Sequence, residues 1–362
     1  MTLRLSGACI RPPMERFAFR AGNDGQYDRF KTMVVPVFLP HSGCNERCIY
    51  CHQGYITDIG EKSFKERVDS ALQGRVEPCE VGLFGGNIFG MEPASLERLF
   101  SCFDEHRGVV KSFRLSTKPV PLRDETIAIL KRNGVDIIEL GIPTFNDAIL
   151  AAVNRAHTAR DLFLAYERLG GEGFRLALQF MVGLPGESQG DIEETVANMI
   201  RLRPVYIRIY PLVVLRNTPL FALYSRGDFV PIPFDEALDR ACLIYLNAMK
   251  HNIDVVNVGL TDNEMVRDMV AGGFYHPAYG FLVQSRIFLR AVEGALKRLD
   301  GPKEITVILH NNDIPLLVGH RRENLSRFAA MGLKLRWEPS GERRGAFKIV
   351  SGTQRVEASV VD

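Results

Sequence analysis

Short apolar runs alternate with longer amphipathic stretches over most of the chain. The apolar runs predict strands at residues 32–40, 80–84, 112–116, 135–140, 174–181, 205–210 and 253–258. Between them, apolar residues at helical spacing predict helices near residues 61–75, 93–107, 122–133, 160–170, 189–203 and 234–251. Repeated strand–helix units with almost continuously apolar strands are typical of parallel sheets. We therefore expect an α/β fold with a partial parallel β/α barrel.

Two further segments flank the predicted barrel. Residues 1–30 form an extension that contains Gly, Arg and Pro, and Gly301 and Pro302 interrupt the pattern near residues 298–304. We expect a barrel domain at residues 31–297 and a small α+β module at residues 298–362. Within that module, residues 304–350 predict a strand, a short helix, a tight turn, a helix and two strands.

Composition excludes several classes of protein. With 362 residues, of which 46% are hydrophobic and 24% are charged, the chain can bury a large core. A net charge of +2 gives no global field that argues for nucleic acid or membrane. No apolar run approaches the roughly 18 residues of a membrane span, and the first residues lack a signal-like apolar region. Seven cysteines, an odd number, do not form a secreted disulfide framework. These features predict a cytoplasmic protein without a membrane partner.

Three of the cysteines lie within GCNERCIYCHQG, residues 43–54. Cys44, Cys48 and Cys51 directly follow the first predicted strand, so they lie at the C-terminal end of the strands, where barrel enzymes carry their chemistry. Four thiolates close a zinc site or fully ligate a [4Fe–4S] cluster, whereas three leave one position open. The spacing therefore predicts a cluster with an open iron. A zinc site completed by His41 or His52, or three unrelated cysteines, are the alternatives.

The stretch CNERCIYC resembles the Cx3CxΦC signature of radical S-adenosylmethionine (SAM) enzymes, with Tyr50 at the Φ position. The resemblance implies that the three cysteines hold a [4Fe–4S] cluster and that SAM binds its fourth iron beside Tyr50. It further implies reductive cleavage of SAM to a 5′-deoxyadenosyl radical, which abstracts hydrogen from the substrate. An electron donor such as a flavodoxin or ferredoxin is implied as a partner.

Other motifs extend this resemblance over roughly residues 32–290. LFGGNIFG, residues 83–90, is similar to the Gly-rich motif that receives the SAM amino group, which implies cofactor contacts for Gly85, Gly86 and Asn87. One branch of these enzymes carries similar motifs in the same order as residues 114–119, 138–150, 154–158, 178–188 and 207–215 of this chain. This branch contains the radical domain of the Elongator catalytic subunit and its shorter bacterial relatives, with oxygen-independent coproporphyrinogen oxidase further away.

That branch implies four more cofactor contacts. They are Ser116 and Lys118 near the ribose, Arg155 near the SAM carboxylate and Gln179 near the ribose hydroxyls. Each has an ordinary alternative: a strand-end serine or lysine facing water, a solvated arginine, or a glutamine at the edge of the core. Pro143 replaces a glutamine that touches SAM in the coproporphyrinogen oxidase branch, so that contact is missing or made by another group.

Substrate-side candidates follow from two further stretches. Tyr275 and His276 lie in MVAGGFYHPAYG, residues 269–280, which resembles the loop after the barrel in bacterial Elongator-like proteins. A packed loop with a hydrogen-bonded histidine is the alternative. Arg208 and Tyr210 alternate with apolar neighbours, so they face one side of a strand, and an inward arginine requires an anionic partner.

The turn GHRR, residues 319–322, resembles the backbone-clamping loop of a KH-type RNA-binding fold. It implies RNA contacts for Arg321 and Arg322, although Arg322 replaces the second glycine and a structural appendage is the alternative. No acetyltransferase signature accompanies the barrel, so the acetyl-transfer half of Elongator chemistry is not expected. We expect a radical SAM enzyme that modifies RNA, with tRNA as the substrate. Chemistry on a small metabolite or tetrapyrrole, or a non-catalytic RNA-binding or zinc-stabilised module, are the alternatives.

Overall fold

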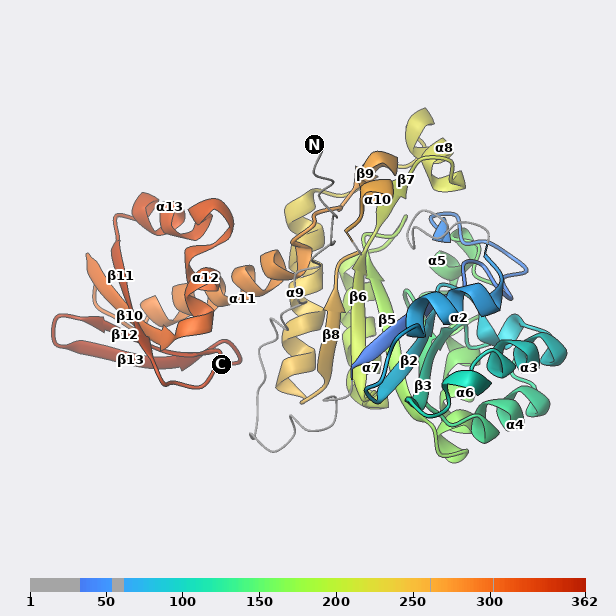
Figure 1. The fold of residues 1–362 in the computed structure, drawn as a ribbon. Coiled ribbons are helices and arrows are strands. Elements are labelled where there is room, and N and C mark those ends of the chain that lie inside the picture. Colours follow the sequence, from blue (N-terminus) through green and yellow to red (C-terminus); the bar gives the residue numbers. More distant parts are fainter. Residues whose placement is uncertain (1–32, 54–61, 261, 302) are drawn as a thin grey trace, which may run out of the picture.

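The computed structural model describes residues 33–53, 62–260, 262–301 and 303–362. The expected N-terminal extension, residues 1–30, lies outside these ranges. Figure 1 shows a strand–helix half-barrel and a smaller module, joined by the long helix α11 (Tyr279–Leu296). In the described residues, no helix is long and apolar enough to cross a membrane.

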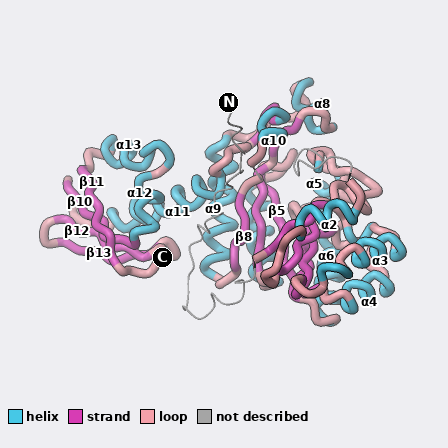
Figure 2. The backbone as a smooth tube through the Cα atoms, in the orientation of Figure 1, coloured by secondary structure: helices cyan, strands magenta, loops and turns pink. Residues whose placement is uncertain are grey.

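Seven parallel strands form the curled sheet of the half-barrel. They are β1 (Val34–Phe38), β2 (Cys79–Phe84), β3 (Val110–Thr117), β4 (Val135–Gly141), β5 (Arg175–Val182), β6 (Tyr206–Pro211) and β8 (Asp254–Val258), and they pair in this order. Each coincides with a run that the sequence predicted to be a strand. The sheet curls without closing, as the magenta strands of Figure 2 show. The partial parallel barrel is therefore confirmed.

Helices cover the outer face of the sheet. They are α2 (Phe64–Leu72), α3 (Pro93–Ser101), α4 (Asp124–Arg132), α5 (Asp147–Ala152), α6 (Ala159–Gly171), α7 (Gln189–Leu202) and α9 (Phe234–Lys250), with the short turns η2 (Ile88–Gly90) and η3 (Asp104–His106). Capping boxes at Ser63, Thr158 and Ser188 satisfy free amide groups and fix where α2, α6 and α7 begin. All of these helices except α5 were predicted.

The sheet is buried on both faces, and the two faces differ. Outward side chains such as Leu115, Ile138 and Ile209 join the main hydrophobic core beneath the helices. On the inner face, Ile137, Ala177 and Tyr206 form a small separate apolar cluster. Side chains two residues further along the same strands share this inner face because side chains alternate along a strand. That position places Glu139, Gln179 and Arg208 in the barrel interior.

Several elements were not predicted from the sequence. β7 (Val213–Leu215) and β9 (Val270–Gly273) form a short antiparallel pair, and α8 (Pro219–Arg226) and α10 (Glu264–Met269) flank it. Such short elements carry too few residues to establish a period. Helix α11 was missed for another reason: eleven of its 18 residues are buried, because α9 and the C-terminal module both pack on it. A helix covered on two sides lacks the single apolar stripe of a surface helix.

The C-terminal module is a four-stranded sheet with two helices. Its elements are β10 (Glu304–His310), η4 (Asn311–Asp313), α12 (Ile314–Val318), η5 (His320–Arg322), α13 (Glu323–Ala330), β11 (Lys334–Ser340), β12 (Ala346–Ser351) and β13 (Gln354–Ser359). The sheet order is β11-β10-β12-β13, with β10 and β11 parallel. The order of elements through β12 follows the prediction, and β13 is additional.

Candidate active site

The cysteine loop, residues 41–53, leaves the C-terminal end of β1. Bonds from Cys44 N to His41 O (2.9 Å) and from Cys51 N to Cys48 O (3.0 Å) fold it into two turns. Burial, together with the neighbouring Cys48 and Cys44, raises the pKa of the Cys51 thiol to about 12. This mutual influence shows that the three thiols face one common space.

No group of three or more His, Cys, Asp or Glu side chains converges on a single point in the described residues. A zinc ion requires such convergence. A four-iron cube binds each thiolate at a different iron, so its ligands surround a body and not a point. His41, one of the two possible zinc ligands, accepts a hydrogen bond from Gln53 N at its Nε2 atom (3.1 Å). Three thiols carried by one loop match the ligand set of such a cluster.

The glycine-rich loop after β2 packs against the cysteine loop, backbone to backbone. A Cβ atom on Gly86 would lie 2.7 Å from Ser42 O, and one on Gly43 would lie 2.2 Å from Asn87 O, so neither position tolerates a side chain. The carbonyl of Gly85 accepts a hydrogen bond from His41 N (3.0 Å). Gly85 and Gly86 thus hold the cysteine loop in place at the position predicted to receive SAM.

Asn87 links this loop to the end of β3. Its Nδ2 atom donates to Gly43 O (3.3 Å), and its Oδ1 atom accepts from Thr117 Oγ1 (2.8 Å) and Lys118 N (3.1 Å). These bonds occupy the amide, so the observed role of Asn87 is to position the loops around it. Its predicted contact with SAM stays a prediction.

The segment after α5 braces the other side of the cysteine loop. Ile49 N donates to Val153 O (3.2 Å), and Asn154 Nδ2 donates to Arg47 O (2.8 Å). Lys118, at the end of β3, donates from Nζ to Glu46 O (3.3 Å), and its charge opposes the rise that burial produces in the pKa of Cys44. Motifs far apart in the sequence therefore fix one loop.

Arg155 and Gln179 converge at the end of β4; their predicted contacts with the cofactor stay predictions. Gly141 pairs with Gln179 across the sheet, and a Cβ atom at Gly141 would lie 3.3 Å from Arg155 Nη2 and 3.5 Å from Gln179 Oε1. Tyr50 is close enough for its charge to influence the pKa of Arg155. A guanidinium, an amide and a phenol thus surround the space beside the thiols.

Polar atoms without partners point to a missing ligand. In the described part of the chain, Arg155 Nε and both ring nitrogens of His157 are buried and have no hydrogen-bond partner. Only 4% of His157 is exposed, and burial lowers the pKa of its imidazole to about 3, helped by the charge of Arg155. Buried polar groups are normally satisfied by protein, water or ligand. The residues therefore fit a polar cofactor, and His157, which lies in the stretch 154–158 but was assigned no role there, is a further candidate.

Beneath this space, Glu139 neutralises the inward Arg208. Arg208 Nε lies 2.9 Å from Glu139 Oε2, Ser116 Oγ donates to Glu139 Oε1 (2.6 Å), and Arg208 Nη1 donates to the Tyr210 hydroxyl (3.3 Å). The guanidinium also stacks over the Phe84 ring, with its carbon 4.5 Å from the ring centroid. The anionic partner expected for Arg208 is thus a carboxylate of this chain. Glu139 lies in the stretch 138–150 that carries the resemblance, but the sequence assigned it no role.

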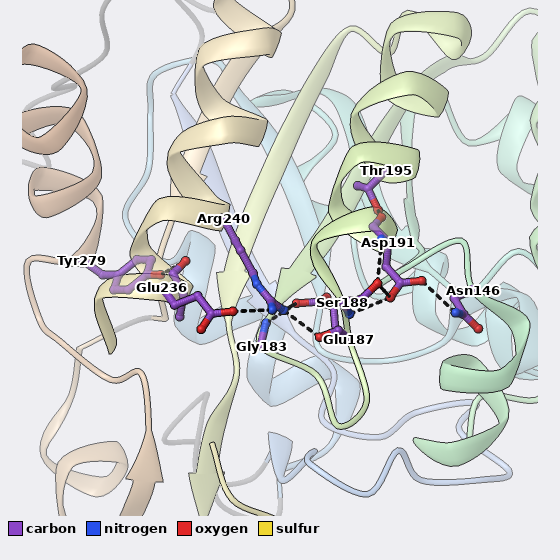
Figure 3. Close-up of polar contacts among 10 residues, drawn as sticks. Asn146, Gly183, Glu187, Ser188, Asp191, Thr195, Glu236, Arg240 and Tyr279 are labelled. Carbon is purple, nitrogen blue, oxygen red and sulfur yellow. Dashed lines mark hydrogen bonds and ion pairs between the residues drawn. The ribbon is translucent and has the colours of Figure 1, made fainter. Parts of the chain in front are cut away.

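The loop at residues 183–187 is fixed by a buried ion pair (Figure 3). Gly183 N donates to Glu187 Oε2 (2.6 Å), and Arg240 Nη1 donates to both the carbonyl and the Oε2 atom of Glu187 (2.9 Å each). Burial raises the pKa of Glu187 to about 7, although these donors act in the opposite direction. Arg240 Nη2 also donates to Glu236 (2.7 Å), so α9 is tied to the loop that ends β5.

The remaining candidates lie between β9 and α11, at the same end of the barrel. The Tyr275 hydroxyl donates to Asp262, which also pairs with Arg267. His276 Nδ1 accepts from Ala278 N (3.0 Å), and its ring meets that of His320 edge-on, with centroids 5.0 Å apart. Since His320 belongs to the GHRR turn, the structure brings Arg321 and Arg322 close to the loop that carries Tyr275 and His276.

Comparisons with known proteins agree with this geometry. Residues 38–199 match the Radical SAM superfamily, and residues 204–288 match the Radical_SAM C-terminal domain. The chain belongs to the radical SAM superfamily. This superfamily uses a [4Fe–4S] cluster and SAM.

Curated relatives of this radical SAM chain carry different names. The heme chaperone HemW of Lactococcus lactis subsp. lactis (strain IL1403) is 25% identical over 51% of this chain and 50% of its own length. The tRNA uridine(34) acetyltransferase of Methanocaldococcus jannaschii is 27% identical over 41% of this chain and 28% of its own length. The chain thus spans half or less of these relatives.

Among solved structures, the chain resembles the archaeal Methanocaldococcus infernus Elp3 with an N-terminal deletion, with a TM-score of 0.54 and 17% identity. The similarity covers 88% of this chain and 74% of that one. At this identity, the likeness shows a shared fold.

Proposed function

We propose that this radical SAM enzyme acts on RNA, with its cluster on Cys44, Cys48 and Cys51. When bound, the cluster and SAM supply the radical chemistry by which hydrogen is abstracted from a substrate. SAM lies against Gly85, Gly86, Arg155 and Gln179 in this proposal. A flavodoxin or ferredoxin serves as the electron donor.

Each side chain around that space has a definite task. Arg155 binds the carboxylate of SAM, because a guanidinium matches a carboxylate in charge and shape. Gln179 bonds the ribose hydroxyls. The Ser116 hydroxyl already donates a hydrogen bond to Glu139, so its oxygen accepts a hydrogen bond from a ribose hydroxyl. Tyr50, backed by Arg155, closes one side and excludes water.

The contact between His276 and His320 supports RNA as the substrate. It places the exposed Arg321 and Arg322 beside the loop at the open end of the barrel. Arginine side chains pair well with phosphate groups, which fix the register of a nucleic acid without reading its sequence. An RNA held at the turn thus has its neighbouring nucleotides near Tyr275 and His276, the substrate-side candidates. The similarity to a tRNA uridine(34) acetyltransferase supports the same substrate class.

Mass spectrometry of nucleosides tests this proposal. Total tRNA is incubated anaerobically with the reconstituted enzyme, SAM and a reductant, then digested. A nucleoside of new mass that requires SAM is the expected result. If the digest is unchanged while the enzyme cleaves SAM, RNA is not the substrate.

A tetrapyrrole is the second candidate. The Lactococcus relative named heme chaperone matches 51% of this chain, more than the 41% matched by the tRNA-modifying relative. The pair His276 and His320 also offers two imidazoles, which are common ligands of haem iron. Titration with haem decides between the candidates: a sharp absorbance change that both His276→Ala and His320→Ala remove favours the tetrapyrrole.

A further inference from the structure

The C-terminal module contains a groove beside the GHRR turn. The groove has a volume of about 490 Å³ and runs between α13 and β11. Its walls are Leu325 and Ala329 from α13, Leu333 just before β11 and Leu335 within it, and Trp337 lies further along that strand. Arg322, the last residue of the turn, also lines the groove. The groove and the turn therefore form one continuous surface.

The groove combines an aromatic ring, apolar walls and positive charge. Trp337 is the only tryptophan of the chain and is 36% exposed. Two of the eight lining residues, Arg322 and Lys334, are cationic, and none is acidic. Lys334 pairs with Glu304 (2.8 Å), but both side chains are more than half exposed, so solvent screens the pair. This composition complements a polyanion with flat apolar bases.

Strand β11 adds an open edge. It is the first strand in the order of the module's sheet, and β10 is its partner there. Most of its residues are exposed, including Arg336 next to Trp337. An edge strand of this kind leaves polar main-chain groups available to a ligand.

The turn that ends the groove is hydrogen-bonded to α11, the helix that joins the module to the barrel. A Cβ atom on Gly319 would lie 2.8 Å from Asn324 Cγ, and Asn324 Nδ2 donates to Ser285 Oγ of α11 (2.9 Å). Arg321 and Arg322 both adopt left-handed backbone conformations, with φ of 49° and 66°. Such conformations are unfavourable for arginine, so the surrounding contacts impose them. The groove thus has a fixed position relative to His276.

We propose that this groove binds single-stranded RNA, with one base stacked on Trp337 and phosphates held by Arg322 and Lys334. The inference rests on the proposed function and deepens it, because it names the part of the substrate that the module grips. The strand continues along the turn, past His320, toward the open end of the barrel. The enzyme therefore recognises an unpaired segment next to the nucleotide that reacts.

Tryptophan fluorescence tests the inference directly, because Trp337 is the only source of the signal. The full-length protein is titrated with an unstructured RNA of about 12 nucleotides, within the usual range of single-strand sites. The emission is expected to fall as RNA is added and to saturate, because a base stacked on Trp337 changes the surroundings of its indole. A duplex of the same sequence is expected to leave it unchanged. Anisotropy of the labelled RNA shows when the protein is saturated with the single strand. If the emission of Trp337 is unchanged at saturation, the proposal is overturned.

Variants measured by anisotropy of a labelled RNA provide the second arm. Trp337→Ala is expected to weaken binding by about 5- to 100-fold, the usual effect of losing one stacked base, and Trp337→Phe is expected to retain most of it. The matched control is Val230→Ala, which changes an exposed apolar residue outside the groove. Equal affinity of Trp337→Ala and the control contradicts the inference. If an extended synthetic peptide quenches Trp337 and RNA does not, the inference is also contradicted, and the groove is a peptide site.

The two proposals fail in different ways. If RNA gives a new nucleoside but leaves Trp337 emission unchanged, the proposed function stands and the groove is not its binding site. If RNA quenches Trp337 but is never modified, the groove inference stands and the proposed function fails.

Discussion

The imidazole of His276 meets that of His320 edge-on, with centroids 5.0 Å apart and ring planes at 90°. One ring belongs to the loop after the barrel and the other to the turn of the C-terminal module. Burial lowers the pKa of His276, and the charges of His320 and Arg321 lower it further. The contact therefore joins two regions that the sequence could identify only separately.

Replacing Cys48 by Ala is expected to abolish cluster assembly, because two thiolates cannot hold a cluster that needs three. Iron and sulfide are measured after anaerobic reconstitution. Cys102→Ala is the matched control: this thiol donates to Arg98 O (3.1 Å), away from the loop, and its loss is expected to leave iron unchanged. Full iron content in Cys48→Ala contradicts the ligand assignment.

Arg155→Ala is expected to weaken SAM binding by about 10- to 100-fold, since hydrogen bonds to charged groups contribute about 1.5–3 kcal/mol. Calorimetry on the reconstituted protein measures the affinity, and iron content is expected to stay the same. Arg132→Ala, which removes an exposed arginine paired with Glu97, serves as the control. Equal affinities for the two variants exclude the assigned role of Arg155.

Removing one partner of the pair between Glu139 and Arg208 is expected to destabilise the fold by about 3–5 kcal/mol, because the other charge stays buried. Urea denaturation of Arg208→Met measures the loss. Lys65→Met is the control: this exposed lysine pairs with Glu105, and because solvent screens the pair its loss is expected to have a much smaller effect on stability than the loss of Arg208. A similar small cost for Arg208→Met shows that Glu139 finds solvent or another partner.

Arg322→Gly is expected to change stability by less than about 1 kcal/mol, because relief of the left-handed strain offsets the entropy of an added glycine. RNA binding is expected to weaken, and the dependence of log K on log salt to flatten by about one unit as one phosphate contact is lost. Gly319→Ala provides the contrast, since its added Cβ atom meets Asn324 and is expected to be clearly destabilising. A wild-type salt slope in the Arg322→Gly variant contradicts the phosphate contact.

The pH dependence of stability is expected to reflect Glu187. Its pKa in the folded protein is raised to about 7, above the usual value near 4.3, so the folded state holds a proton that the unfolded state has lost. The contribution of Glu187 to the free energy of unfolding is therefore fully present below about pH 4.3 and is lost as the pH rises toward about 7. Urea denaturation measures the free energy of unfolding of wild type and of Glu187→Gln from about pH 5 to about pH 8. The dependence of this free energy on pH is then compared between the two proteins. A wild-type protein that gains stability over the variant as pH rises contradicts this direction.

The sequence predicted the barrel well because its strands are nearly continuous apolar runs separated by capped helices. Cys44, Cys48 and Cys51 were recognisable from spacing, since one loop carries all three. The sequence assigned no role to Glu139 or His157, because the partners of Glu139 lie on strands that are distant in sequence and the burial of His157 is created by the fold. The groove at Trp337 was missed for the same reason: its walls come from a helix and an edge strand that only the fold brings together.

Formation of 5′-deoxyadenosine tests the central claim most directly. The anaerobically reconstituted protein is supplied with SAM and a reductant, and the product is quantified with and without total tRNA. The account predicts product in both cases, with strong stimulation by tRNA. Product that tRNA leaves unchanged contradicts RNA as the substrate, and absence of any product contradicts the radical chemistry itself.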